Sequence, residues 1–170
     1  MNIFLQTQRL VITVPSLSDF KDQYTLQSDP DTMQYIGSGI RAEDEVRESL
    51  KNAILHYEKH GFSLGSVFEK KTGNFIGRSG LIYLGFEDTQ PEIEIAYALL
   101  KPYWGQGYAS ELVKVLVDWG FKNLPIGKLV AVINPGNERS RRVLEKSGFH
   151  YVKRAQYRIH EVDLYQLIKN

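Results

Sequence analysis

The chain has 170 residues, and at roughly 100–200 residues per domain this length predicts one domain over residues 1–170. It has no cysteine, which excludes a disulfide scaffold, a thiol nucleophile and cysteine-ligated zinc or iron–sulfur sites. A net charge of +1 argues against a broad nucleic-acid-binding surface, and 42% hydrophobic with 24% charged residues is typical of a globular protein.

The first elements in the chain are a strand and two helices. Residues 10–14 alternate and are rich in β-branched side chains, which predicts a strand. A serine at position 16 or 18 can cap a helix that runs to about residue 28, where the pair Asp29-Pro30 breaks it. Apolar residues then recur every three or four positions over residues 42–60, and this predicts an amphipathic helix closed by Gly61.

Strands are predicted next over residues 62–69, 74–84 and 92–100, with a hairpin turn at 71–74. A helix over residues 107–122 is apolar around most of its circumference, so we expect it to be largely buried against a sheet.

The chain ends with a strand, a capped helix and two strands, over residues 128–133, 137–147, 150–156 and 161–168. The order of elements indicates a mixed α/β (α+β) domain whose front half is antiparallel. The first residues lack the order of a secretory signal, and no apolar stretch reaches the length of a membrane span. We therefore expect a cytoplasmic protein with no membrane partner.

The segment over residues 102–110, Pro-Tyr-Trp-Gly-Gln-Gly-Tyr-Ala-Ser, carries the strongest chemical signal. Gly105 and Gly107 allow the backbone to approach a ligand closely, and the helix that follows presents free amide groups at its positive end. This combination predicts an anion site suited to a pyrophosphate. The alternative is that the two glycines only make a tight turn. The P-loop spacing is absent, and the third glycine of a dinucleotide-binding loop is replaced by Ser110.

Three motifs in order resemble the GNAT superfamily of acyl-CoA-dependent N-acyltransferases, in particular its branch of RimJ/RimL-type ribosomal-protein N-acetyltransferases. The first is Thr-Gln-Arg-Leu-Val-Ile at 7–12, which resembles the opening strand of that branch. The second joins Glu-Ile-Ala-Tyr at 94–97 to the glycine loop at 103–109, and the third comprises residues 137–140 and 145–149.

The resemblance implies a splayed, mostly antiparallel sheet of six to seven strands with helices on both faces. Acetyl-CoA, the implied cosubstrate, would lie between the strands at 92–100 and 128–133. Its pantetheine would pair with the backbone of Tyr97, Ala98 and Leu99. Its pyrophosphate would bind the amides of Trp104, Gly105, Gln106, Gly107, Tyr108 and Ala109.

Acetyl transfer to an amine needs a base, because an amine at neutral pH is mostly protonated. Glu94 lies at the position where the family often has its base, and burial in an apolar strand would raise the pKa of its carboxyl. The alternatives are a structural ion pair or a solvent-facing side chain, and Glu92 is the second choice. The tyrosine that often protonates the leaving thiolate is replaced by Leu144, so Ser140 is the substitute acid, unless it only takes part in capping its helix.

Further contacts to the coenzyme are expected from Asn134, Asn137, Arg142 and Lys146. Asn137 is also a helix N-cap, and the basic residues of its helix otherwise form a solvated face. Tyr35, Tyr83, Tyr103 and Trp104 are candidates for lining the acceptor pocket, with the hydrophobic core as their alternative place.

The resemblance, together with these residues, implies an N-acetyltransferase that moves acetyl from acetyl-CoA to a primary amine by direct attack in a ternary complex. The acceptor stays open among a protein N-terminus, a polyamine and a small amine, and no nucleic acid is expected as partner. A homodimer is compatible with the resemblance. The alternative function is a non-catalytic module that binds acyl-CoA.

Overall fold

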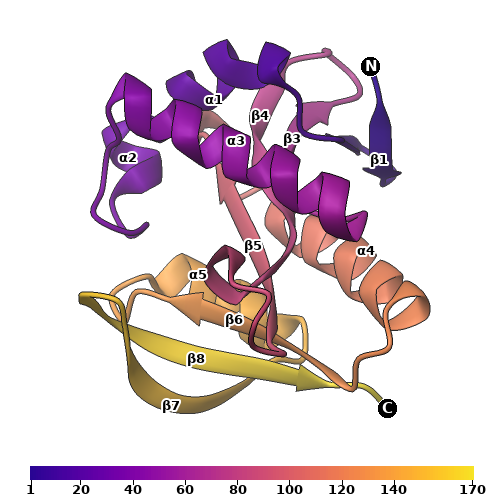
Figure 1. Cartoon of the computed structure of the whole chain (residues 1–170), viewed down its shortest axis with the longest axis vertical. Helices are drawn as coiled ribbons and strands as arrows, with labels where there is room; N and C mark the ends of the chain where they lie inside the picture. The colour runs from indigo at the N-terminus through magenta and orange to yellow at the C-terminus, as the bar shows by residue number, and fades with distance from the viewer.

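The computed structural model describes residues 1–170 and has one open sheet of eight strands in the order β1-β2-β3-β4-β5-β6-β8-β7 (Figure 1). All neighbouring strands are antiparallel except β5 and β6, which run parallel. The strands are β1 (Ile3–Gln6), β2 (Leu10–Thr13), β3 (Leu64–Glu69), β4 (Phe75–Tyr83), β5 (Ile93–Leu99), β6 (Lys128–Ile133), β7 (His150–Tyr157) and β8 (His160–Ile168).

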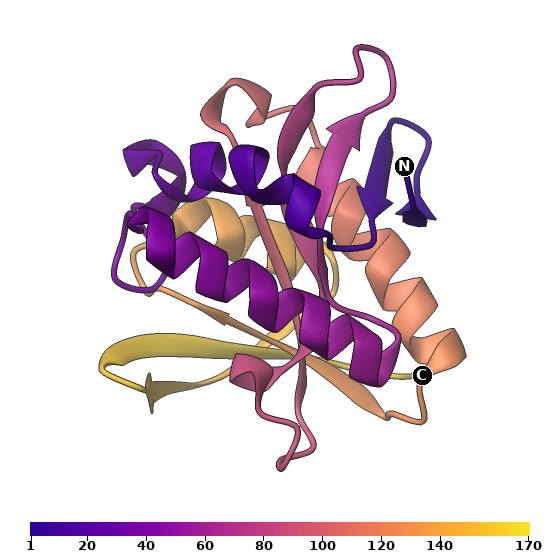
Figure 2. The ribbon, with the colours of Figure 1, turned by 45° about the horizontal axis from the view of Figure 1, so that its top comes forward.

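The helices cover both faces of this sheet, as expected. Figures 1 and 2 show α1 and α3 on one face, and α4 and α5 on the other. The helices are α1 (Phe20–Gln27), α2 (Pro30–Met33), α3 (Glu43–His60), α4 (Tyr108–Asn123) and α5 (Glu138–Lys146), with short 3-10 turns at Leu17–Asp19, Leu84–Phe86 and Lys101–Tyr103. No helix combines the length and the apolar character that crossing a membrane requires.

The main core lies where the sheet packs against α4. Leu112, Val113 and Leu116 of α4 are fully buried against strand residues such as Ile95 and Leu129. The apolar helix predicted from the sequence is therefore the helix that supports the central strands. Its first residue follows the glycine loop directly, so the packing of α4 also fixes where that loop lies.

Two expectations needed correction. The sheet has eight strands instead of six to seven, because the edge strand β1 has only four residues, none of them fully buried, and shows no clear alternation. The pair Asp29-Pro30 does end α1, but it also begins α2. Asp29 caps this short helix by accepting a hydrogen bond from the amide of Thr32 at 3.0 Å, and Pro30 is its first residue.

The parallel pair β5 and β6 is joined by a single bridge, between Glu94 and Val130. Beyond this bridge the two strands separate toward their C-terminal ends. The sheet is therefore split over the second half of β5, next to the N-terminus of α4 and the N-terminus of α5.

Candidate functional site

A cleft of about 1710 Å³ occupies the split between β5 and β6. It is lined by the segment between α2 and α3, the glycine loop, the first turns of α4 and α5, and the turn between β7 and β8. The volume exceeds the roughly 300–1,000 Å³ of an ordinary small-molecule pocket. The cleft therefore has room for a large ligand and a second, smaller one.

The hydrogen bonds between β4 and β5 decide which backbone groups of β5 face this cleft. The amide of Leu84 donates to the carbonyl of Glu92, and the amide of Leu100 donates to the carbonyl of Ile76, both at 2.9 Å. In an antiparallel pair such bonds fall on alternate residues. The even-numbered residues of β5 therefore bond to β4, and the odd-numbered residues direct their backbone groups toward the cleft.

This alternation distinguishes the three residues predicted to pair with pantetheine. Tyr97 and Leu99 direct backbone groups into the cleft, whereas the backbone of Ala98 is paired with Arg78 of β4. The carbonyl of Leu99 already accepts a hydrogen bond from the indole nitrogen of Trp104 at 2.7 Å. The free groups are therefore the amide and carbonyl of Tyr97 and the amide of Leu99.

The glycine loop presents a row of free amides. None of the six main-chain N–H groups from Gly105 to Ser110 donates a hydrogen bond within the protein, and the first bonded amide of α4 is that of Glu111, to the carbonyl of Gly107 at 3.1 Å. Gly105 and Gly107 have φ angles of 74° and 81°, in the left-handed region that favours glycine. The amide of Trp104, which the sequence placed in this set, is instead bonded to the carbonyl of Lys101 at 3.0 Å.

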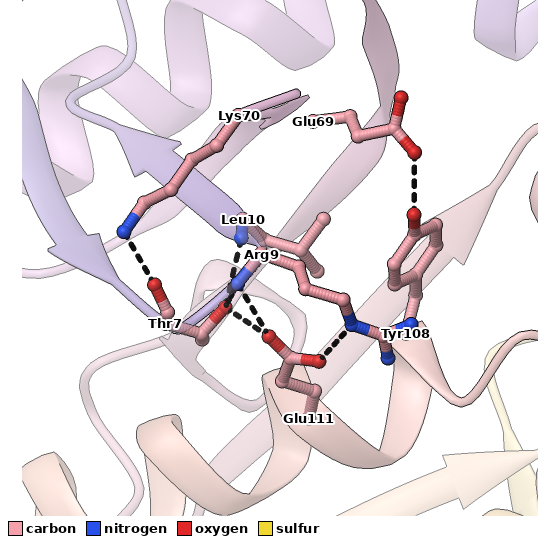
Figure 3. Close-up of polar contacts among 7 residues, drawn as sticks. All are labelled: Thr7, Arg9, Leu10, Glu69, Lys70, Tyr108 and Glu111. Atoms are coloured by element: carbon pink, nitrogen blue, oxygen red, sulfur yellow. Dashed lines mark hydrogen bonds and ion pairs between the residues drawn. The ribbon is translucent and has the colours of Figure 1, made fainter. Parts of the chain in front are cut away.

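A polar network connects the start of α4 to the turn between β1 and β2 and to β3 (Figure 3). The carboxylate of Glu111 accepts hydrogen bonds from the Thr7 hydroxyl at 2.5 Å, the Arg9 amide at 3.0 Å and the Arg9 Nε at 2.8 Å. The Arg9 guanidinium also lies 4.3 Å from the ring centre of Tyr108, whose hydroxyl donates to Glu69. These contacts hold the free amides in one orientation, so the loop does not depend on a ligand for its position.

Glu94 lies at the point where β5 and β6 separate, and it lines the cleft. Its carboxylate is buried and has no ion-pair partner, which excludes the alternative of a structural ion pair. Burial raises the pKa of this carboxyl to about 7, against the opposing effects of the Gly85 amide and of the positive charges on Arg78 and Arg158. By contrast, Glu92 is paired with Lys128 at 3.1 Å at the surface.

Ser140 lies on the other side of the split, in the first turn of α5. Its Oγ is 2.9 Å from the hydroxyl of Tyr97, and its amide donates to the Asn137 side chain at 3.2 Å. Burial raises the pKa of the Tyr97 phenol to about 12, although the hydrogen bond with Ser140 acts in the opposite direction. Leu144 is fully buried in the core. The structure thus places a phenol beside Ser140, supplied by β5 rather than by the helix.

The basic residues of α5 divide between two faces. Arg139, Arg142 and Lys146 recur at helical spacing and line the cleft, and none of them forms an ion pair. Arg141 is instead paired with the two glutamates of the helix, Glu138 and Glu145. The predicted Arg142 and Lys146 are therefore free cations at the edge of the cleft, whereas the guanidinium of Arg139 lies over the Trp104 ring, 4.8 Å from its centre.

The side-chain oxygens of Asn134 and Asn137 accept hydrogen bonds from backbone amides near the start of α5. Asn137 caps the helix, as described above, and the Oδ1 of Asn134 accepts a hydrogen bond from the amide of Gly136 at 2.8 Å. Both residues line the cleft, so their amide nitrogens are the groups available to a ligand. Of the four aromatic candidates, Tyr83 does not line the cleft but packs against His60, with ring centres 4.7 Å apart.

Two cleft residues have no signal in the sequence. Arg41 follows the glycine-rich segment after α2, and Arg78 lies in the middle of β4, and both line the cleft near Glu94. Neither belongs to a recognisable motif, and they are separated by 37 positions in the chain. Only the fold brings them together.

Comparison with known proteins gives a consistent result. Residues 9–150 match the family described as the acetyltransferase (GNAT) domain. The uncharacterized protein YkkB of Bacillus subtilis (strain 168) is 38% identical over 137 residues, which cover 78% of each chain. The acetyltransferase from Agrobacterium tumefaciens str. C58 has the same fold, with a TM-score of 0.84 at 23% identity over 99% of both chains. RimL, the ribosomal L7/L12 alpha-N-protein acetyltransferase solved in complex with coenzyme A, has a TM-score of 0.78 at 19% identity over 98% of both chains.

Proposed function

Because the chain belongs to the GNAT acetyltransferase family, we propose that it transfers the acetyl group of acetyl-CoA to a primary amine within a ternary complex. The observation that carries this proposal is the row of six unbonded amides from Gly105 to Ser110, at the mouth of a split sheet. Amides at a helix N-terminus bind anions, and a diphosphate group needs several such donors at once. The loop is thus suited to the charged part of the cosubstrate.

The remaining contacts follow the length of the cleft. The backbone of Tyr97 and the amide of Leu99 are positioned to pair with the two amide groups of pantetheine, as an added strand would. The free cations Arg142 and Lys146 are suited to the 3′-phosphate of the coenzyme. Asn134 and Asn137 line the same channel, and their amide nitrogens are not used as donors within the protein.

Glu94 is proposed as the general base. A base acts best when its pKa lies near the working pH, and burial gives this carboxyl a pKa of about 7. The proton leaves the ammonium group of the acceptor for Glu94, directly or through one water molecule, and the neutral amine then attacks the thioester carbon. The C–S bond breaks as the amide forms, and the nitrogen releases its second proton to water. No covalent enzyme intermediate is needed.

The hydroxyls of Ser140 and Tyr97 are proposed to stabilise the thiolate that leaves. The Tyr97 phenol has a pKa of about 12, roughly three pH units above that of a thiol, so proton transfer from it to the thiolate is uphill. One hydroxyl of the pair therefore donates to the other, the second donates to the sulfur, and the thiolate takes its proton from water. This role needs no tyrosine at the position of Leu144.

The test is release of free thiol from acetyl-CoA in the presence of a library of amines, followed with a thiol-reactive dye. Acceptor-dependent release is expected, with one acetylated amine formed for each thiol. Tight binding of coenzyme A without turnover on any amine would contradict the proposal and favour a binding module instead. The Glu94→Gln variant serves as the matched control for non-enzymatic acetylation.

A further inference from the structure

Two arginines on the Glu94 side of the cleft have no carboxylate partner. The Nη1 of Arg41 donates to Gln27 Oε1 at 2.7 Å and to Ser49 Oγ at 3.3 Å. The Nη1 of Arg78 donates to the same Ser49 oxygen at 3.4 Å. Neither guanidinium has an acidic oxygen within 4.0 Å. Two positive charges therefore share one neutral hydroxyl group.

This arrangement is electrostatically unfavourable without an anion. Burial and, to a smaller extent, the charge of Arg41 lower the pKa of Arg78 to about 9, although Glu94 acts in the opposite direction. Burial also lowers the pKa of Arg41; Glu45 opposes this effect, and the nearby charge of Arg158 adds to it. The Glu45 carboxylate is exposed and bonded to the amide of Ala42 at 2.9 Å, so it does not neutralise the pair. A desolvated cation is stabilised when a ligand supplies the missing negative charge.

The two arginines and the proposed base are on the same side of the sheet. Arg78 pairs with Ala98 of β5, and Glu94 lies four residues before Ala98, so both side chains extend from one face. Between them on β5 is only Ala96, whose methyl group takes little space. A ligand that lies on this face of the sheet can therefore contact Glu94 at one end and the two arginines at the other.

We infer that the acceptor amine also carries a carboxylate group, which Arg41 and Arg78 bind. Each guanidinium has five N–H donors, and most of them are not used within the protein. Paired guanidinium groups match the two oxygens of a carboxylate. The inference rests on the proposed acetyl transfer and narrows its acceptor to amino acids or to short peptides. Polyamines and aminoglycosides, which carry only positive charge, place a cation where the protein already has two.

The experiment compares each amino acid with its own amide, in kcat/KM for thiol release by the intact enzyme. Amidation removes the carboxylate and lowers the pKa of the amine, so intrinsic reactivity favours the amide. A preference of ~10-fold or more for the acid is expected, as charge-assisted hydrogen bonds provide. Equal or higher kcat/KM for the amides, or for polyamines, would overturn the inference while acetyl transfer itself stands.

Three variants locate the preference. Arg41→Gln and Arg78→Gln are expected to raise the KM for the carboxylate-bearing acceptor ~10-fold or more, and Arg78→Lys is expected to restore part of the loss. Arg47→Gln is the matched control, because Arg47 does not line the cleft and is paired with the exposed Glu43. A KM that rises equally in the control would contradict the assignment.

A binding measurement separates this inference from the proposed function. N-acetyl amino acids, the expected products, are titrated calorimetrically into the enzyme loaded with coenzyme A, alongside the corresponding N-acetyl amides. Tighter binding of the acids in wild type, lost in Arg41→Gln, would support the carboxylate site even if no amine were turned over. Equal binding of acids and amides would refute it, whatever the activity.

Discussion

Replacing Glu94 by Gln is expected to slow acetyl transfer and to stabilise the fold at the same time. Both effects have one cause, the burial of a carboxylate without an ion-pair partner. Removing a general base typically lowers the rate by ~10²–10⁴-fold. The loss should be largest near neutral pH and smaller at high pH, where the amine is already neutral.

The gain in stability follows from the difference between the folded and unfolded pKa values. Burial raises the pKa of Glu94 from 4.5 to about 7, so between these values the folded chain holds a proton that the unfolded chain has lost. Stability therefore falls as the pH rises through this range, by about 3.5 kcal/mol at roughly 1.4 kcal/mol per pH unit. Gln does not ionise, so Glu94→Gln avoids this loss at pH 8 and gains little below pH 4.5.

The assay is denaturant unfolding of wild type and Glu94→Gln at pH 5 and pH 8, together with kcat/KM as a function of pH. The wild-type rate should rise with an apparent pKa of about 7, and the variant should lose this dependence. Glu92→Gln is the control, because Glu92 pairs with Lys128 at the surface and its replacement should change stability by less than about 0.5 kcal/mol. A Glu94→Gln variant that is less stable than wild type at pH 8, or that retains the wild-type pH profile, would refute the reasoning.

Three further predictions concern the cosubstrate side of the cleft. Gly107→Ala should raise the KM for acetyl-CoA, because a left-handed non-glycine residue costs about 1–2 kcal/mol, whereas Gly61→Ala introduces the same strain at the end of α3, outside the cleft, and should leave this KM unchanged. Glu111→Gln should lower the free energy of unfolding by about 1–2 kcal/mol and also raise the KM for acetyl-CoA, and denaturant unfolding with initial rates checks both. Tyr97→Phe and Ser140→Ala should each lower kcat, and a double-mutant cycle should give a coupling of about 0.5–1.5 kcal/mol, since their hydroxyls are 2.9 Å apart; additive effects would contradict a shared role.

The sequence predicted those features that short stretches of the chain determine. The buried α4 was predicted from its apolar circumference, and the strand β6 was predicted with the bounds that the structure has, residues 128–133. The free amides around Gly105 and Gly107 followed from glycine chemistry and from the place of the loop before a helix. Each of these signals lies within about twenty residues of the chain.

Features that depend on tertiary contacts were not predictable in this way. The hydroxyl pair of Tyr97 and Ser140 joins residues 43 positions apart, and the Glu111 network joins α4 to residues more than 100 positions earlier. No residue type or spacing in the sequence indicates that these side chains are in contact. The same holds for Arg41 and Arg78, each of which is an ordinary surface residue by type, until the fold places both beside one serine.

The single bridge between β5 and β6 makes the sheet mechanically discontinuous. The strands from β1 to β5 form one half, those from β6 to β8 form the other, and little backbone hydrogen bonding crosses the seam. A ligand that pairs with the exposed edge of β5 would act as a missing strand and join the halves. Hydrogen exchange at the amides of Tyr97 and Leu99 should therefore be fast in the free protein and slow markedly when coenzyme A is bound. The bound cosubstrate would then complete the sheet.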